Sequence, residues 1–204
     1  MHIDKESIVW GPLMQRIKLD QSVIDFLWSG ANAIRGVDEL NAEHLLAGAM
    51  HDEWSYDFSA MNKFSHLIKP YIKSYTEDLS RHISKNVPDS WRLLALWVNF
   101  QKSGDYNPLH DHTGDLSFVI YLNIPEELKT EKKVLGYKGR GPDPGSITFV
   151  HGDTRPPFYD ARKFFLPENG DMFIFPSCLY HTVNPFKTEG ITRVSVSGNL
   201  VFNV

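Results

Sequence analysis

From Ser90 to the end of the chain, short runs of aromatic and β-branched residues alternate with Gly, Pro, Asn and Asp. Residues of the first kind favour strands, and those of the second kind favour turns. Several short strands at close spacing predict an antiparallel sandwich or barrel. The expected strands span residues 91–101, 116–124, 146–151, 171–176, 180–183 and 191–204.

The first 90 residues have a different periodicity, in which apolar side chains recur every three or four positions. Asp20 is placed to cap a helix that ends near Gly36, and a second amphipathic helix is expected over residues 58–85. Pro70 is expected to break or kink that second helix. Residues 8–19, before the first helix, are expected to be extended.

Composition limits the classes of function. The 204 residues carry a net charge of −4, which provides no global field for binding phosphate backbones, so no nucleic-acid partner is expected. The single cysteine, Cys178, excludes an internal disulfide and a thiolate metal cluster, so any metal depends on the nine histidines and the carboxylates. Without a signal-peptide pattern or a long apolar stretch, we expect a cytoplasmic protein with no membrane partner.

Two histidines separated by one residue are the most informative local feature. If the segment from Tyr106 to Asp115 enters a strand, His110 and His112 point to the same face while Asp111 points away. Two imidazoles on one face can converge on a single metal ion. His181, at the start of a later strand, is the candidate third ligand, and His151 is a weaker candidate for lining the same pocket.

The last long strand carries Arg193 and, two residues on, Ser195 on the same face. A guanidinium binds a carboxylate through two parallel hydrogen bonds, and burying it on a core strand is costly unless an anion neutralises it. The sequence therefore predicts a metal and a carboxylate-bearing small molecule in one barrel mouth. The loops at residues 136–145 and 153–169 are expected near that mouth.

Residues from Trp91 to Val204 resemble the Fe(II)- and 2-oxoglutarate-dependent oxygenases, in particular the prolyl-hydroxylase-like branch with small bacterial and phage members. The matching motifs are Tyr-Asn-Pro-x-His-x-His from Tyr106, Tyr-Leu at Tyr121, Gly-Asp-x-x-x-Phe-Pro-Ser from Gly170, His181, and Arg-x-Ser at Arg193. The resemblance implies a double-stranded β-helix, or jelly roll. The length of 204 residues predicts a single domain over residues 1–204. The resemblance implies a helical buttress at 1–90 and the catalytic β core at 91–204.

The resemblance implies roles for individual residues. His110 and His181 fall where the family places its two iron-binding histidines. Arg193 matches the residue that pairs with the distal carboxylate of 2-oxoglutarate, with Ser195 and Tyr121 as hydrogen-bonding companions. The implied cofactors are Fe(II), 2-oxoglutarate as cosubstrate, and O2.

The position two beyond the first histidine normally supplies a carboxylate, and here it is His112. Three ligand sets remain open. His110, His112 and His181 could form an all-histidine site, or a β-bulge could turn Asp111 toward the metal. In the third set, His112 takes the place of the first histidine ligand. Gly114, two residues later, then offers no ligand, which leaves one position on the metal open, as in related halogenases.

These expectations describe a dioxygenase that hydroxylates a peptide or protein side chain, or a small molecule, with release of succinate and CO2. The alternatives are a non-oxygenase metal cupin or hydrolase, and an inactive jelly roll used as a binding or structural module. A hydrolase needs no residues that bind a dicarboxylate, so the presence of Arg193 and Ser195 disfavours the hydrolase. The oligomeric state stays open.

Overall fold

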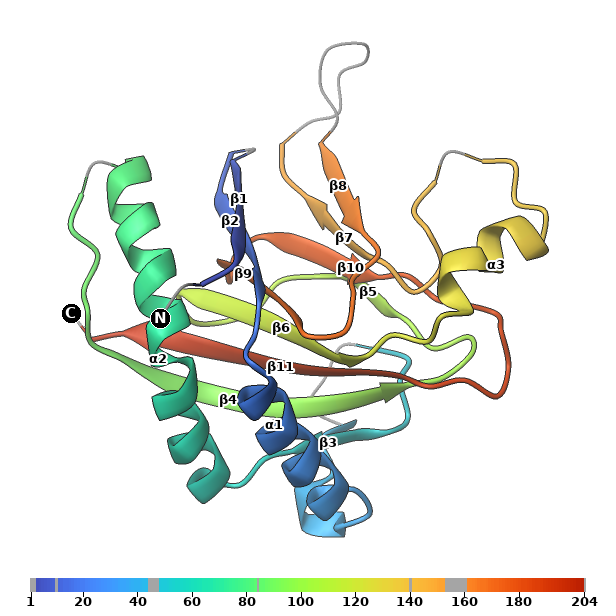
Figure 1. The fold of residues 1–204 in the computed structure, drawn as a ribbon, viewed down its shortest axis with the longest axis horizontal. Helices are drawn as coiled ribbons and strands as arrows, with labels where there is room; N and C mark the ends of the chain where they lie inside the picture. The colour runs from blue at the N-terminus through green and yellow to red at the C-terminus, as the bar shows by residue number, and fades with distance from the viewer. Residues whose placement is uncertain are drawn as a thin grey trace.

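The computed structural model describes residues 3–9, 11–43, 48–83, 85–139, 141–152 and 161–203, and its strands form two antiparallel sheets (Figure 1). The larger sheet has the order β1 (Lys5–Val9), β2 (Leu13–Lys18), β9 (Asp171–Pro176), β6 (Leu116–Asn123), β11 (Arg193–Phe202), β4 (Trp91–Gln101) and β3 (Glu53–Ser55). The smaller sheet has the order β5 (Asn107–His110), β10 (Tyr180–Val183), β7 (Ile147–Val150) and β8 (Arg162–Phe165). The expected mainly β jelly roll is confirmed.

Two helices, α1 (Gln21–Ile34) and α2 (Phe58–Ile83), cover one face of the larger sheet (Figure 1). Alternate residues of the central strands, such as Val98, Val194 and Val196, share a buried cluster with the apolar stripes of these helices. Because side chains on a strand alternate between faces, their neighbours face the smaller sheet. The two-sided burial of the larger sheet therefore directs a second set of residues into the space between the sheets.

The N-terminal segment departs from a purely helical buttress. It contributes β1, β2 and β3 to the larger sheet, and the extended character expected for residues 8–19 is found in β1 and β2. Asp20 occupies the N-cap position of α1 but makes no capping hydrogen bond with its side chain, which instead accepts one from the Tyr71 hydroxyl (2.8 Å). Pro70 lies inside α2 without ending it.

Most expected strands of the second half are present at or within two residues of their predicted ends. The expected loop at 153–169 is corrected, because β8 lies within it and pairs with β7, while residues 153–160 fall outside the described chain. A short helix, α3 (Leu128–Val134), and a 3-10 turn, η1 (Asp38–Leu40), were not anticipated. These elements are too short for a clear periodic signal.

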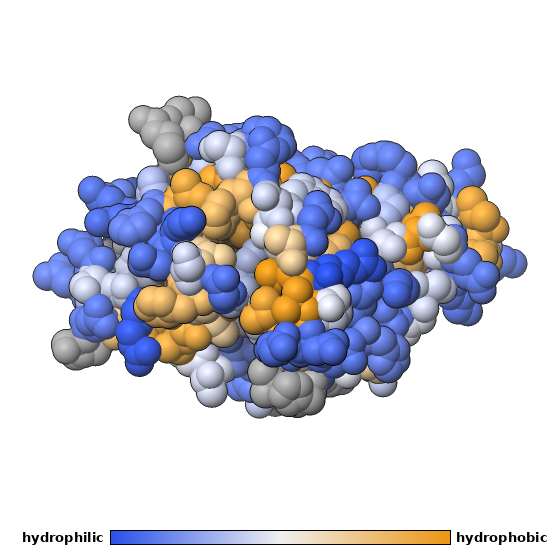
Figure 2. Space-filling view, turned by 90° about the horizontal axis from the view of Figure 1, so that it is seen from below, coloured by the Kyte–Doolittle hydropathy of each residue, from blue (hydrophilic) through white to orange (hydrophobic). Residues whose placement is uncertain are grey.

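The face seen from below in Figure 1 has apolar patches bordered by hydrophilic side chains (Figure 2). No helix in the described ranges has both the length and the apolar character needed to cross a membrane.

Close packing at Gly198 on β11 provides a test of this arrangement. A Cβ at this position would lie 2.7 Å from the carbonyl oxygen of Ala95 and would overlap the Phe118 ring, whereas a Cβ at Gly141 would meet no atom within 4 Å. We expect Gly198→Ala to lower the free energy of unfolding by about 1–3 kcal/mol in urea titrations. Gly141→Ala, the matched control, should change it by less than about 0.5 kcal/mol; equal effects would contradict the packing.

Candidate metal centre and adjoining cavity

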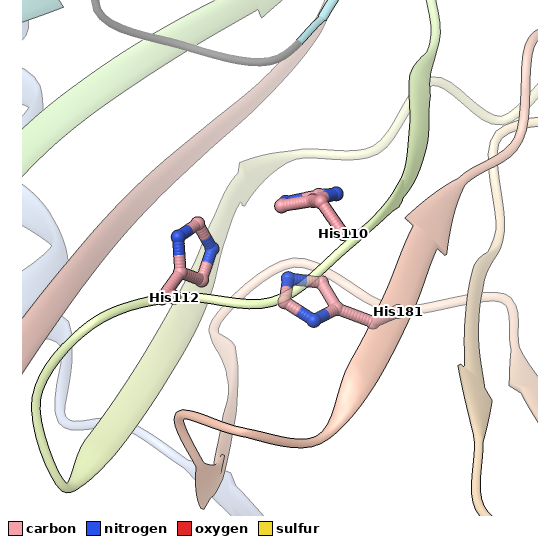
Figure 3. Close-up of side chains that lie close together, drawn as sticks. All are labelled: His110, His112 and His181. Atoms are coloured by element: carbon pink, nitrogen blue, oxygen red, sulfur yellow. The ribbon is translucent and has the colours of Figure 1, made fainter.

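Three histidine side chains meet between the sheets (Figure 3). His110 ends β5, His181 lies opposite it on the paired strand β10, and His112 follows two residues after β5. One ring nitrogen of each lies within 4.8 Å of the others. This spacing suits three nitrogen ligands around one metal ion.

His112 is held by the backbone rather than by a strand. β5 stops at His110, so strand alternation does not by itself place His112. The backbone N–H of His112 donates to the carbonyl oxygen of Ser177 (2.9 Å), in the turn before β10. This contact ties the segment carrying His110 and His112 to the segment leading to His181.

Backbone carbonyls orient two of the rings. Nδ1 of His110 lies 2.7 Å from the carbonyl oxygen of Pro108, and Nδ1 of His181 lies 2.9 Å from that of Leu179. A carbonyl accepts only, so each Nδ1 carries the proton and donates it, which leaves Nε2 with a free lone pair. Metal-binding histidines are commonly oriented by such a bond.

Burial favours the neutral form of the rings. Desolvation, followed by the nearby His110, lowers the pKa of His181 to about 3 and that of His112 to about 4. Only a neutral imidazole offers a lone pair to a metal. Both rings are therefore in the metal-binding form at neutral pH.

The histidines face a cavity of about 170 Å³, several times the ~30 Å³ that one water occupies in the liquid. Arg193 and Ser195 of β11 lie on its wall, on the same face of the strand as expected. Asp111 also lines the cavity but is exposed and stands outside the histidine cluster. His151 is exposed and is not among the lining residues.

The lining combines residues from both sheets. It consists of Met50, Trp97, Asn99, Asn107, His110, Asp111, His112, Phe118, Val119, Ile147, Phe175, His181, Val183, Arg193, Ser195 and Ser197.

Arg193 is the least satisfied buried cation of the described chain. It is 1% exposed, and Nη1 donates to the carbonyl oxygen of Gly145, while Nε has no partner. The ring of Tyr121 lies against the guanidinium at 5.3 Å, and the buried Tyr121 hydroxyl also lacks a partner. None of the described carboxylates pairs with Arg193, so the site has donors and positive charge available for an anion.

Sequence reasoning assigned no role in the site to the cavity residues Asn99 of β4 and Asn107 of β5. Asn99 interrupts an otherwise apolar stretch of β4, and a polar residue in such a stretch is the signal that could have identified it. Glu53, on β3 beside Asn99, lies in a segment for which no strand was predicted.

Comparison with solved structures places this fold among oxygenases. A prolyl-4-hydroxylase from Pseudomonas putida is 14% identical, with a TM-score of 0.56 and coverage of 94% of this chain and 93% of its own. HygX from Streptomyces hygroscopicus, solved with nickel, 2-oxoglutarate and hygromycin B, is 10% identical, with a TM-score of 0.60 and coverage of 93% and 83%. At these identities the likeness establishes the fold. No curated protein sequence matches this chain.

A family model for 2OG-Fe(II) oxygenases matches residues 95–199, which is just over half of the chain and includes all three histidines of the cluster and Arg193. The chain belongs to the 2OG-Fe(II) oxygenase family, whose members depend on Fe(II), 2-oxoglutarate and O2.

Proposed function

We propose that His110, His112 and His181 hold Fe(II) through their Nε2 or equivalent ring nitrogens. The proposal is supported by the convergence of the rings, by the carbonyls that orient His110 and His181, and by the neutrality of the buried imidazoles. Asp111 is the alternative third ligand, but its exposure and its position outside the cluster favour His112. A third neutral ligand leaves the iron site one unit more positive than two histidines and a carboxylate do.

Arg193 is proposed to bind the distal carboxylate of 2-oxoglutarate. Its Nε has no partner in the described chain, and a carboxylate can accept from it while neutralising the charge. Ser195 lies two residues on, facing the same cavity, and the guanidinium lies over the ring of Tyr121, whose hydroxyl has no partner. These three side chains would fix one end of the cosubstrate so that its other end reaches the histidines.

The reaction proposed is hydroxylation of a C–H bond in a peptide side chain or a small molecule. With O2 as the oxidant, bound iron and 2-oxoglutarate would supply the oxidising chemistry, with succinate and CO2 as coproducts. The residues of this chain position both groups, keep the imidazoles neutral, and limit water between the sheets. The buried, unneutralised Arg193 beside the histidine cluster is the observation that carries this function.

The first prediction concerns the joint complex of iron and cosubstrate. Anaerobic titration of the purified protein with Fe(II) and then 2-oxoglutarate should produce the weak visible charge-transfer band of the chelate. Succinate, which lacks the 2-oxo group, serves as the matched control and should produce no band. A correctly folded protein that shows no band with 2-oxoglutarate would contradict the proposed function.

The second prediction separates cosubstrate binding from metal binding. Arg193→Ala should weaken 2-oxoglutarate affinity by about 10–100-fold, because it removes charge-assisted hydrogen bonds, while iron affinity changes little. Calorimetric titration of the metal-loaded protein measures both affinities. Arg92→Ala, at an exposed position of β4, is the control; equal loss of metal and cosubstrate in Arg193→Ala would remove its assigned role.

The third prediction decides the third ligand. His112→Ala should lower Fe(II) retention in anaerobic dialysis by more than the ~10–100-fold expected for losing an outer partner of a ligand. Asp111→Ala, a change at the adjacent exposed residue, should retain iron. The reverse pattern would assign the ligand to Asp111, and iron retention in both variants would favour a site that uses neither side chain.

A further inference from the structure

The buried polar atoms near the cavity that lack a hydrogen-bond partner in the described chain divide by chemistry. On β11 and β6 they belong to Arg193 and Tyr121, which can donate to an anion. On β3, β4 and β5 they are all acceptor oxygens, on Glu53, Asn99, Gln101 and Asn107. Gln101 and Asn99 are the cross-strand neighbours of Arg193 and Ser195. The first group is accounted for by 2-oxoglutarate, whereas the second group has no assigned ligand.

Glu53 lies next to the cavity wall. It pairs with Asn99 across β3 and β4, so the two side chains share a face of the sheet with Cβ atoms about 4.5–5.5 Å apart. Asn99 lines the cavity and is 4% exposed, and its Oδ1 has no partner. The following residue, Trp54, belongs to the cluster under the helices, which confirms that Glu53 faces the other way.

The chain before β3 encloses this region. The backbone N–H of Ala49 donates to the carbonyl oxygen of Tyr106 (3.0 Å), and Met50 lines the cavity. Gly48 packs so closely against Asn107 that a Cβ there would overlap the amide. As a result Glu53 is only 1% exposed, and water does not solvate its carboxyl group.

The surroundings of Glu53 are acidic. Burial, and then the charges of Glu43 and Asp105, raise the pKa of Glu53 to about 8. No described Lys, Arg or His pairs with this carboxyl, and Lys102 forms its ion pair with Asp52 (3.3 Å). Gln101 donates Nε2 to the carbonyl oxygen of Asp105 (2.6 Å), which leaves only its acceptor oxygen unpaired. A positively charged ligand would supply what this region lacks.

We propose that the primary substrate carries a positively charged nitrogen group, a primary ammonium or a guanidinium, and that Glu53 binds it together with Asn99 and Asn107. Several N–H donors on one cation can satisfy a carboxylate and two amide oxygens at once. An amide can turn to present its NH2 group instead. The raised pKa keeps the Glu53 carboxyl group protonated in the ligand-free protein at neutral pH. A bound cation stabilises its ionised form, which only accepts hydrogen bonds, so Glu53 favours a positively charged ligand. This assignment rests on the proposed function, because 2-oxoglutarate is assigned to Arg193.

Calorimetric titration of the protein loaded with Ni(II) and 2-oxoglutarate tests the assignment, with n-butylammonium and n-butylguanidinium as probes. At least one of the two cations should bind about tenfold or more tightly than 1-butanol and butyrate, which have similar chains. Glu53→Gln should reduce the cation affinity by about tenfold or more. Glu126→Gln, which removes an exposed carboxylate paired with Lys129, is the matched control and should bind as the wild type does.

Equal cation binding by wild type and Glu53→Gln would overturn the proposal, as would equal binding of 1-butanol or no binding of either cation. Displacement of the probes by K⁺ or Mg²⁺ at lower concentrations than the probes themselves would assign the site to an inorganic cation instead. Should Glu53→Gln fail to fold, Asn99→Ala takes its place with the same expected loss. Because Glu53→Gln should keep the charge-transfer band with Fe(II) and 2-oxoglutarate, failure of this assignment is distinguishable from failure of the oxygenase function.

Discussion

Burial of the larger sheet on both faces is the constraint from which the rest of the site follows. Along β11, Val194 and Val196 pack under the helices, while Arg193 and Ser195 turn toward the smaller sheet. Polar groups on the inner face are cut off from water, so each must find a partner or cost free energy. The strands provide partners for most backbone groups, but not for the side chains that face the cavity.

Two buried side chains of opposite chemistry consequently lie at or beside the cavity. Arg193 brings an unneutralised cation to the cavity wall, and Glu53 brings a carboxyl group without a cation to the neighbouring strand β3. The two side chains come from strands on either side of β4, and they do not pair with each other. A dianionic cosubstrate would neutralise Arg193, and a cationic substrate group would stabilise the ionised form of Glu53, so one buried side chain matches the charge of each ligand.

The three histidines add a cluster of ring nitrogens to the same cavity. His110 and His181 are cross-strand neighbours, and carbonyls two residues before each ring hold their Nδ1 protons. His112 is brought in by a backbone contact with Ser177 instead. With no carboxylate in the cluster, the positive charge of bound iron would be balanced mainly by its exogenous ligands. Anion binding at Arg193 and anion binding at the metal would therefore each favour the other.

Residue order and strand alternation predicted an antiparallel sandwich or barrel, most strands of the second half, and the shared face of Arg193 and Ser195, whereas the jelly roll itself came from the resemblance to a known family. Those features depend on local periodicity and on side-chain chemistry, which can be recognised in the sequence. The short strand β3 and the role of Glu53 beside Asn99 were not predictable, because a three-residue strand has no periodic signal and its pairing with β4 spans more than forty residues. The chemistry available to the protein was thus determined by its residue types. Tertiary structure alone decided which buried ionisable groups were left without partners, since only folding brings distant strands together and excludes water from between them.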